Sequence, residues 1–153
     1  IFNILYNIYV VDVALDRNND DPQKIFESLN STGLKLKQSD MIRNFLLMSF
    51  EGAEQKNIYN NHWMTVQLRV GENYLDNFFR DFLTALTYTI PNKNNVFNDF
   101  KEYVKRENSK GNTSIEILKL IHKYSLYYGW ILHSEDTKWI RELKSSVSYP
   151  FLL

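Results

Sequence analysis

Residues 72–89 read ENYLDNFFRDFLTALTYT. Their apolar side chains follow the i, i+3, i+4, i+7 spacing of an amphipathic helix, at Leu75, Phe78, Phe79, Phe82, Leu83 and Leu86. Pro91 and the asparagines after it end this pattern, because proline and asparagine favour turns. The stretch therefore predicts a helix over residues 72–89 whose aromatic face is buried in a core.

Further helical patterns flank this stretch. One helix is expected over residues 54–68, and another is marked by Phe97, Phe100 and Val104. Thr113 and Glu116 have the spacing of a capping box, which predicts the start of a long helix. The apolar positions of that helix are Ile117, Ile121, Tyr124, Tyr128 and Ile131, and those of a last helix are Trp139, Ile140 and Leu143. Most residues after Ser39 should therefore be helical, in a bundle of roughly four or more helices.

The sequence before this bundle has a different character. Residues 4–15 are rich in β-branched and aromatic side chains and favour a buried strand, although their spacing also tolerates a helix. Asp21 and Pro22 read as a helix start, and Gly33 can end that helix. Ser39 can cap a second helix with Ile42 on its apolar face. The predicted fold is mainly α, with a small α/β remnant at the N-terminal end followed by a helical bundle.

The composition is that of a globular domain. The 153 residues include 18 basic and 18 acidic side chains, and this balance argues against a free-standing nucleic-acid-binding protein. The 10 Phe, 10 Tyr and 3 Trp favour an aromatic core, with base stacking as the alternative. The absence of cysteine and of any membrane-length apolar run favours a cytoplasmic protein with no membrane partner. Both apolar ends suggest a piece of a longer polypeptide.

Residues 21–47, DPQKIFESLNSTGLKLKQSDMIRNFLL, carry the most specific pattern in the chain. They resemble the end of the N-terminal, ParB/sulfiredoxin-like domain of GmrSD-like restriction enzymes. The positions that match the family's pattern are Ile25, Phe26, Glu27, Leu29, Asn30, Gly33, Leu36, Asp40, Ile42, Arg43 and Asn44. Beyond residue 47 the resemblance is general, and it extends through Trp63 and the helix around Phe78 to the closing residues 148–153.

The resemblance implies a domain order and an activity. Residues 1–50 would form the C-terminal part of the ParB/sulfiredoxin-like domain, and residues 51–153 a helical connector before a nuclease domain. The bacterial parent protein would use a nucleoside triphosphate and a divalent metal to restrict DNA, often DNA with modified bases. The family's Asp-Gly-Gln-Gln-Arg and His-Asn-His motifs are absent from this sequence. The chain alone is therefore expected to be inactive and to hold no cofactor, to reach DNA through the parent, and to be capable of self-association.

The resemblance also implies a nucleotide-binding role for a small polar loop and a nearby arginine, namely Asn30, Ser31, Thr32, Gly33 and Arg43. Backbone N–H groups and the Asn30 amide suit phosphate or ribose, and Arg43 offers a bidentate fork. The alternative interpretation is a helix stop at Gly33 and a solvated Arg43. His62, His122 and His133 have no metal-ligand spacing, so neither a metal site nor catalytic residues are predicted. A helical scaffold or protein-interaction module without nucleotide contact remains the alternative function.

Overall fold

The computed structural model describes residues 24–25, 28, 36–142 and 146–153. The chain divides into two compact units, residues 1–35 and 36–153, and the second holds nearly all of the described residues. Helix accounts for 82% of the described residues, and none of them forms a strand. The predicted helical bundle is thus confirmed. The strand expected over residues 4–15, and with it the α/β remnant, lies outside the described residues.

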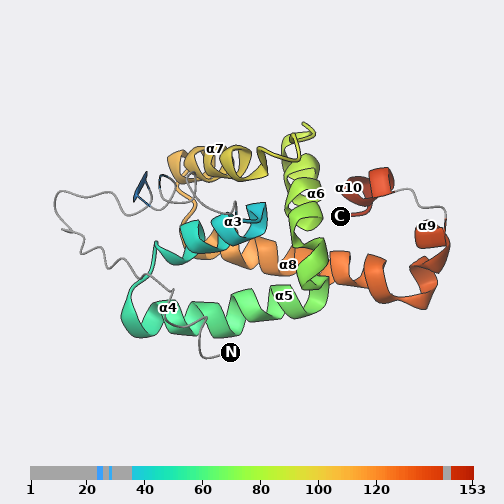
Figure 1. The fold of residues 1–153 in the computed structure, drawn as a ribbon, viewed down its shortest axis with the longest axis horizontal. Helices are drawn as coiled ribbons and strands as arrows, with labels where there is room; N and C mark the ends of the chain where they lie inside the picture. The colour runs from blue at the N-terminus through green and yellow to red at the C-terminus, as the bar shows by residue number, and fades with distance from the viewer. Residues whose placement is uncertain (1–23, 26–27, 29–35, 143–145) are drawn as a thin grey trace, which may run out of the picture. The chain divides into compact units, whose positions relative to one another are not determined.

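The helices before the central α6 are short. They are α3 (Gln38–Leu47), α4 (Gly52–Ile58) and α5 (Met64–Val70). A π-helical turn over Tyr59–Trp63 joins α4 to α5, and Figure 1 shows the three segments as one continuous rod. The helix predicted over residues 54–68 is confirmed in this form. The wider turn ends at Trp63, whose side chain is buried.

The remaining helices include the three longest. They are α6 (Leu75–Thr87), α7 (Val96–Ser109) and α8 (Ser114–His133), followed by the short α9 (Lys138–Glu142) and α10 (Tyr149–Leu152). Turns of 3-10 helix precede α6, α9 and α10, over Glu72–Tyr74, Glu135–Thr137 and Ser146–Ser148. The helix predicted over residues 72–89 is therefore confirmed, with its first turn in the 3-10 form. Leu143, expected in the last helix, lies outside the described residues.

Aromatic rings from the π-helical turn, α6 and α7 pack together at the centre of the bundle. Phe78, Phe79 and Phe82 of α6 have no exposed surface, and Phe79 stacks on Trp63 with ring centroids 5.8 Å apart and planes 9° apart. Phe79 also meets the edge of Phe100 from α7, at 5.8 Å. The predicted burial of the α6 face is confirmed at Leu75 and at these rings, whereas Leu86 is only partly buried.

The start of α3 is held by other helices. Ser39 was predicted to cap this helix, and that prediction is wrong: α3 begins at Gln38, and Lys37 at the cap position makes no side-chain hydrogen bond that caps the helix. Instead, the Ser39 N–H donates to Asp76 Oδ1 of α6 at 2.8 Å. Gln38 Oε1 in turn accepts the N–H of Phe97, at the start of α7, at 2.9 Å. The first turns of α3, α6 and α7 are thus bonded to one another.

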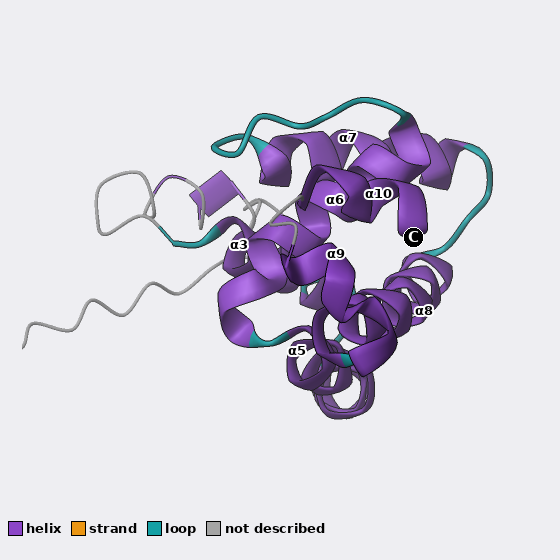
Figure 2. Cartoon of the chain, turned by 90° about the vertical axis from the view of Figure 1, so that its right-hand side faces the viewer, coloured by secondary structure: helices purple, strands orange, loops and turns teal. Residues whose placement is uncertain are grey.

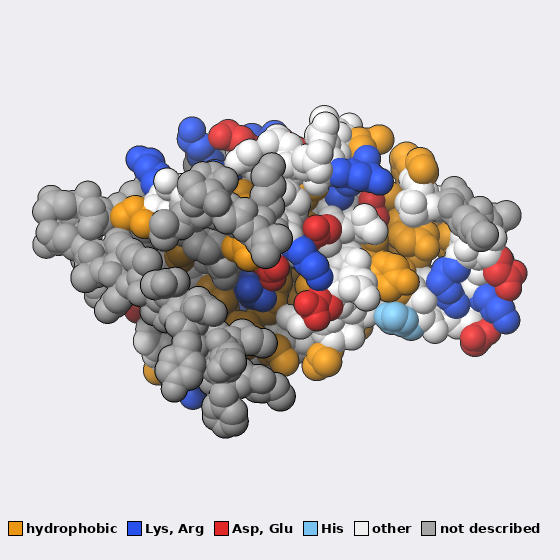
Figure 3. Space-filling view, in the orientation of Figure 1, with side chains coloured by type: hydrophobic (Ala, Val, Ile, Leu, Met, Phe, Trp, Pro, Cys, Tyr) orange, Lys and Arg blue, Asp and Glu red, His pale blue; other side chains and the backbone are white. Residues whose placement is uncertain are grey.

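The predicted capping box at the start of α8 is confirmed. The Glu116 N–H donates to Thr113 Oγ1 at 3.3 Å, and the Thr113 N–H donates to Glu116 Oε2 at 2.6 Å. Acidic and basic side chains are interspersed over the face drawn in Figure 3, in keeping with the equal numbers of the two. None of the described helices combines the length and the apolar character needed to cross a membrane.

Candidate functional site

Arg43 is the one predicted site residue that lies among the described residues. It is on α3, and its Nη1 is 3.2 Å from Asp40 Oδ1 one turn earlier. Both side chains are about one-third exposed. Asp40 lies in the first turn of α3, as predicted, where a carboxylate interacts favourably with the helix dipole. Asn30, Ser31, Thr32 and Gly33 lie outside the described residues, so their approach to Arg43 stays a prediction.

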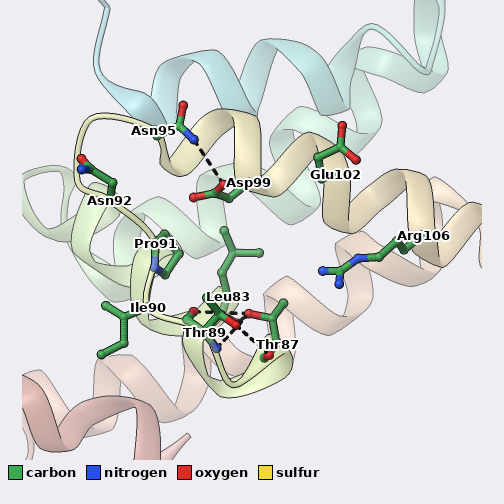
Figure 4. Close-up of a pocket in the computed structure, with 10 residues that line it drawn as sticks. All are labelled: Leu83, Thr87, Thr89, Ile90, Pro91, Asn92, Asn95, Asp99, Glu102 and Arg106. Carbon is green, nitrogen blue, oxygen red and sulfur yellow. Dashed lines mark hydrogen bonds between the residues drawn. The ribbon is translucent and has the colours of Figure 1, made fainter.

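A cavity of about 510 Å³ opens between the end of α6 and α7. Figure 4 shows that its walls come from the last turn of α6, the loop after it and one side of α7. The lining residues are Leu83, Thr87, Thr89, Ile90, Pro91, Asn92, Asn95, Asp99, Glu102 and Arg106. The sequence of this loop indicates only the end of a helix and does not predict the cavity.

The lining of this cavity contains both hydrogen-bond donors and hydrogen-bond acceptors. The Thr87 hydroxyl donates to the Leu83 carbonyl at 2.8 Å and accepts the Thr89 N–H at 3.4 Å, so it is bonded within the loop. Asp99 Oδ1 accepts from Asn95 Nδ2 at 3.2 Å, and Arg106 supplies the cation in the lining. The ten lining residues include no histidine, cysteine or lysine. The lining thus combines two carboxylates, two side-chain amides and one guanidinium, which suits a small polar ligand.

The loop of the cavity has an unusual backbone. Tyr88, which follows α6, has φ of 56°, a left-handed conformation that non-glycine residues seldom adopt, and its side chain is 93% exposed. Arg80 Nε donates to the Pro91 carbonyl at 2.9 Å and ties the loop back to α6. The loop is thus held to α6 where it begins and again at Pro91. The Tyr88 ring contributes little to the core, because it is almost fully exposed.

A second cluster of functional side chains lies between α5 and α8. The rings of His62 and His122 are 5.8 Å apart, although they are 60 residues apart in the sequence. Arg69 Nη1 lies 3.3 Å from His122 Nε2 and donates to the His122 carbonyl at 3.2 Å. Burial, then the charges of Arg69 and His62, lower the pKa of His122. His133 Nε2 donates to the Arg69 carbonyl at 3.1 Å.

This histidine cluster is poorly suited to a metal. The guanidinium of Arg69 would repel a cation beside His122. Within residues 24–25, 28, 36–142 and 146–153, no group of three or more His, Asp or Glu side chains is placed to hold a metal ion. The cluster instead joins α5 to α8 through the imidazole rings and the Arg69 guanidinium. Histidine spacing in the sequence gave no sign of it, because the residues meet only through packing.

A buried carboxylate joins α6 to α8. Asp81 is 7% exposed, and its Oδ2 accepts the Tyr128 hydroxyl at 3.0 Å. Burial raises the pKa of Asp81 to about 6, against the opposing effects of the Tyr128 hydrogen bond and the Arg80 charge. Burial, with the nearby Asp81 charge, also raises the pKa of Tyr128. Tyr149 of α10 meets the edge of the Tyr128 ring at 5.8 Å, so three helices converge here.

Comparison with family models, with curated proteins and with solved structures found no significant match for this chain.

Proposed function

We propose that this chain is part of a nucleotide-dependent, modification-dependent DNA restriction endonuclease of the GmrSD-like family. It would contribute part of the nucleotide-hydrolysing domain and the helical connector, while a nucleoside triphosphate, a divalent metal and DNA would be bound by the whole protein. The observation that supports the proposal is the run of matching positions between Ile25 and Asn44, with its Asn30 and Gly33 loop and its Arg43.

The anchoring of α3 gives the connector a physical role in this proposal. Residues 30–33 come shortly before α3 in the sequence, and α3 is bonded at its first turn to α6 and α7. Ile42 and Leu46 of α3 are buried in the same core as the α6 rings. A rearrangement of the loop on nucleotide hydrolysis would therefore be passed to the bundle through a helix that cannot move independently of it.

Arg43 would be the nucleotide contact supplied by α3. Its ion pair with Asp40 limits the freedom of the guanidinium and leaves about a third of the side chain exposed. Such a group can bind phosphate oxygens with less loss of rotamer entropy than a fully solvated arginine. Asp40 would then be a positioning residue rather than a general base.

The test is nucleotide hydrolysis by the full-length protein that the proposal implies. Asn30→Ala should reduce turnover at least about tenfold, which is about 1.4 kcal/mol of transition-state stabilisation, with little change in melting temperature. Asn77→Ala removes an exposed amide of α6 and serves as the matched control. The 153-residue chain alone should neither hydrolyse nucleotide nor cut DNA. Normal turnover with a lowered melting temperature for Asn30→Ala would instead support the helix-stop interpretation.

A helical scaffold that binds another protein is the second candidate function. Large apolar side chains are exposed from α8 to α10, at Leu126, Trp130, Trp139, Val147 and Phe151. Figure 3 shows hydrophobic side chains at the surface in the part of the molecule that holds α6 and α10. Under this alternative the full-length protein would bind no nucleoside triphosphate, and equilibrium binding to a labelled nucleotide distinguishes the two.

A further inference from the structure

Three charged side chains of α7 line the cavity between α6 and α7. They are Asp99, Glu102 and Arg106, and their spacing of three and four residues places them on one side of the helix. Figure 2 shows α7 at the margin of the bundle, beside α6. The nearby Arg80 and Lys93 are not among the lining residues. The charged part of the lining therefore consists of two carboxylates and one guanidinium.

Glu102 and Arg106 do not neutralise each other. Their i, i+4 spacing is that of a helical ion pair. Within the part of the chain that the structure describes, however, neither side chain has a hydrogen bond or an ion pair. Figure 4 shows the Arg106 guanidinium extended from α7 toward Thr87 of α6. Both charged groups can therefore pair with a ligand without breaking a bond within the protein.

Asp99 is held in place by two asparagines. Asn95 Nδ2 donates to Asp99 Oδ1 at 3.2 Å, and Asn98 Nδ2 donates to Asn95 Oδ1 at 2.7 Å. None of the described residues donates to the second oxygen, Asp99 Oδ2. The carboxylate is partly buried, and its orientation is fixed before a ligand arrives, which lowers the entropy cost of binding.

The remainder of the cavity offers an apolar wall. Leu83, Ile90 and Pro91 supply the apolar part of the lining. Arg80 Nε donates to the Pro91 carbonyl at 2.9 Å, so the loop that carries this wall is anchored to α6. The volume of about 510 Å³ lies in the range of about 300–1,000 Å³ that small-molecule sites occupy.

We propose that this cavity binds a free basic amino acid, lysine or arginine. Such a molecule carries two cationic groups and one carboxylate, the complement of two carboxylates and one guanidinium. Its α-carboxylate pairs with Arg106 and its α-ammonium with the adjacent Glu102, while its side-chain cation pairs with Asp99. The aliphatic part of the ligand then packs on Ile90 and Pro91.

The spacing along α7 favours a long ligand over a short one. Asp99 and Arg106 are about 10.5 Å apart along the helix axis, and the Arg106 side chain shortens this gap by leaning toward the start of α7. A simple amine would leave the guanidinium unpaired, and a simple anion would leave both carboxylates unpaired. None of the lining residues belongs to the nucleotide site proposed above, so the two proposals can fail independently.

Titration of the 153-residue chain with L-lysine, followed by heteronuclear NMR of its backbone amides, tests the proposal. We expect a dissociation constant of about 0.1–1 mM, because the ligand is small and the cavity is open to solvent. Three analogues each lack one charged group: cadaverine the α-carboxylate, ε-aminocaproate the α-ammonium and norleucine the side-chain cation. Each should bind at least about tenfold more weakly than lysine.

Two results of this titration would overturn the proposal. One is the absence of shift changes among residues 83–106 at lysine concentrations up to about 10 mM. The other is binding of cadaverine as tight as that of lysine, which would show that the cavity takes amines without reading the carboxylate.

Substitutions assign each charge of the ligand to its partner. Arg106→Gln should weaken lysine binding at least about tenfold and leave cadaverine binding unchanged, whereas Asp99→Asn should weaken lysine binding and leave norleucine binding unchanged. The analogue that each variant still binds shows that the variant is folded. Lys105→Gln removes the same charge from an exposed neighbour outside the lining and should leave lysine binding unchanged. Equal losses for Arg106→Gln and Lys105→Gln would show a general effect of charge and overturn the proposal.

Discussion

Helices α6 and α8 both contribute aromatic side chains to the core, and they use their rings differently. The three phenylalanines of α6 are fully buried and contact Trp63, Phe100 and one another. On α8, Tyr128 is buried with 1% exposed, whereas Trp130 is 54% exposed. The rings of α6 therefore contribute to folding, and those of α8 are divided between the core and the solvent.

The difference between the two helices shows what amphipathic spacing predicts and what it does not. In α6 the apolar side chains lie on one face, which is core and also holds the buried Asp81, and the other face is solvated. In α8 apolar residues occur on both sides, and only the side facing α5 and α6 is packed. An aromatic residue in α8 can therefore be either buried or exposed. Its contribution to stability is best measured by comparing substitutions in α8 with substitutions in α6.

The largest expected effect comes from truncating a ring on α6. Phe79→Ala should lower the free energy of unfolding by about 3–5 kcal/mol, because it leaves a cavity between Trp63 and Phe100. Trp130→Ala on α8 should change it by less than about 0.5 kcal/mol, because more than half of that side chain is exposed. Urea denaturation of both variants measures the contrast. Similar losses for both would remove the distinction between the two helices.

A second prediction concerns the carboxylate that joins the two helices. Asp81 has an ordinary pKa of 3.8 in the unfolded chain and a pKa of about 6 in the fold. Below pH 3.8 both states are protonated, and as the pH rises the unfolded chain releases its proton first. Stability is therefore lost as the pH rises from about 4 to about 6. The pKa difference of about two units corresponds to a loss of up to about 3 kcal/mol.

Asp81→Asn isolates this pH dependence, because asparagine does not titrate and can still accept from Tyr128. The stability of the variant relative to the unsubstituted protein should rise between pH 4 and pH 6. Comparison of the two proteins at each pH cancels the contributions of Glu107 and Glu116 to the pH dependence of stability. Their pKa values are lowered, so these contributions have the opposite sign to that of Asp81. Parallel stability curves would show that Asp81 titrates normally and is not desolvated between α6 and α8.

Gly129 tests how closely α8 approaches α5. A Cβ added there would lie 2.9 Å from the Arg69 carbonyl oxygen, closer than real Cβ contacts. Gly129→Ala should therefore destabilise the protein by about 1–2 kcal/mol, even though alanine favours a helix by about 1 kcal/mol over glycine. Leu126→Ala, at an exposed position of the same helix, should cost less than about 0.5 kcal/mol. A thermal melt in which Gly129→Ala is more stable would show that the helices can separate without cost.

Features whose cause lies within a few residues were predictable from the sequence. The capping box of α8 and the buried face of α6 depend on spacings of three or four residues, and both were found. The ion pair of Arg43 with Asp40 is equally local. Of the candidate site, only this part falls within the described residues, and the role of residues 30–33 stays a prediction.

Features that depend on long-range packing were not predictable from the sequence. Ser39 was expected to use its own hydroxyl as a cap, but its N–H is bonded to Asp76, 37 residues away. His62 and His122 meet through the packing of α5 and α8, which no motif spacing encodes. The cavity between α6 and α7 arises from where one helix ends beside another. To predict any of these three features, one has to know which helices pack against each other.

The smallest expected effect comes from the side-chain N-cap of α8, a feature that α6 lacks. Thr113 caps α8 with its own side chain, whereas Tyr74 at the start of α6 makes no side-chain cap bond. Thr113→Ala should lower the free energy of unfolding by about 1 kcal/mol, because the Glu116 N–H loses its acceptor. Thr113→Ser retains the hydroxyl and should change the stability by less than half as much, which makes it the matched control in urea denaturation. If both variants behave like the unsubstituted protein, α8 is held by tertiary packing alone, as α6 is, and its local cap contributes nothing measurable.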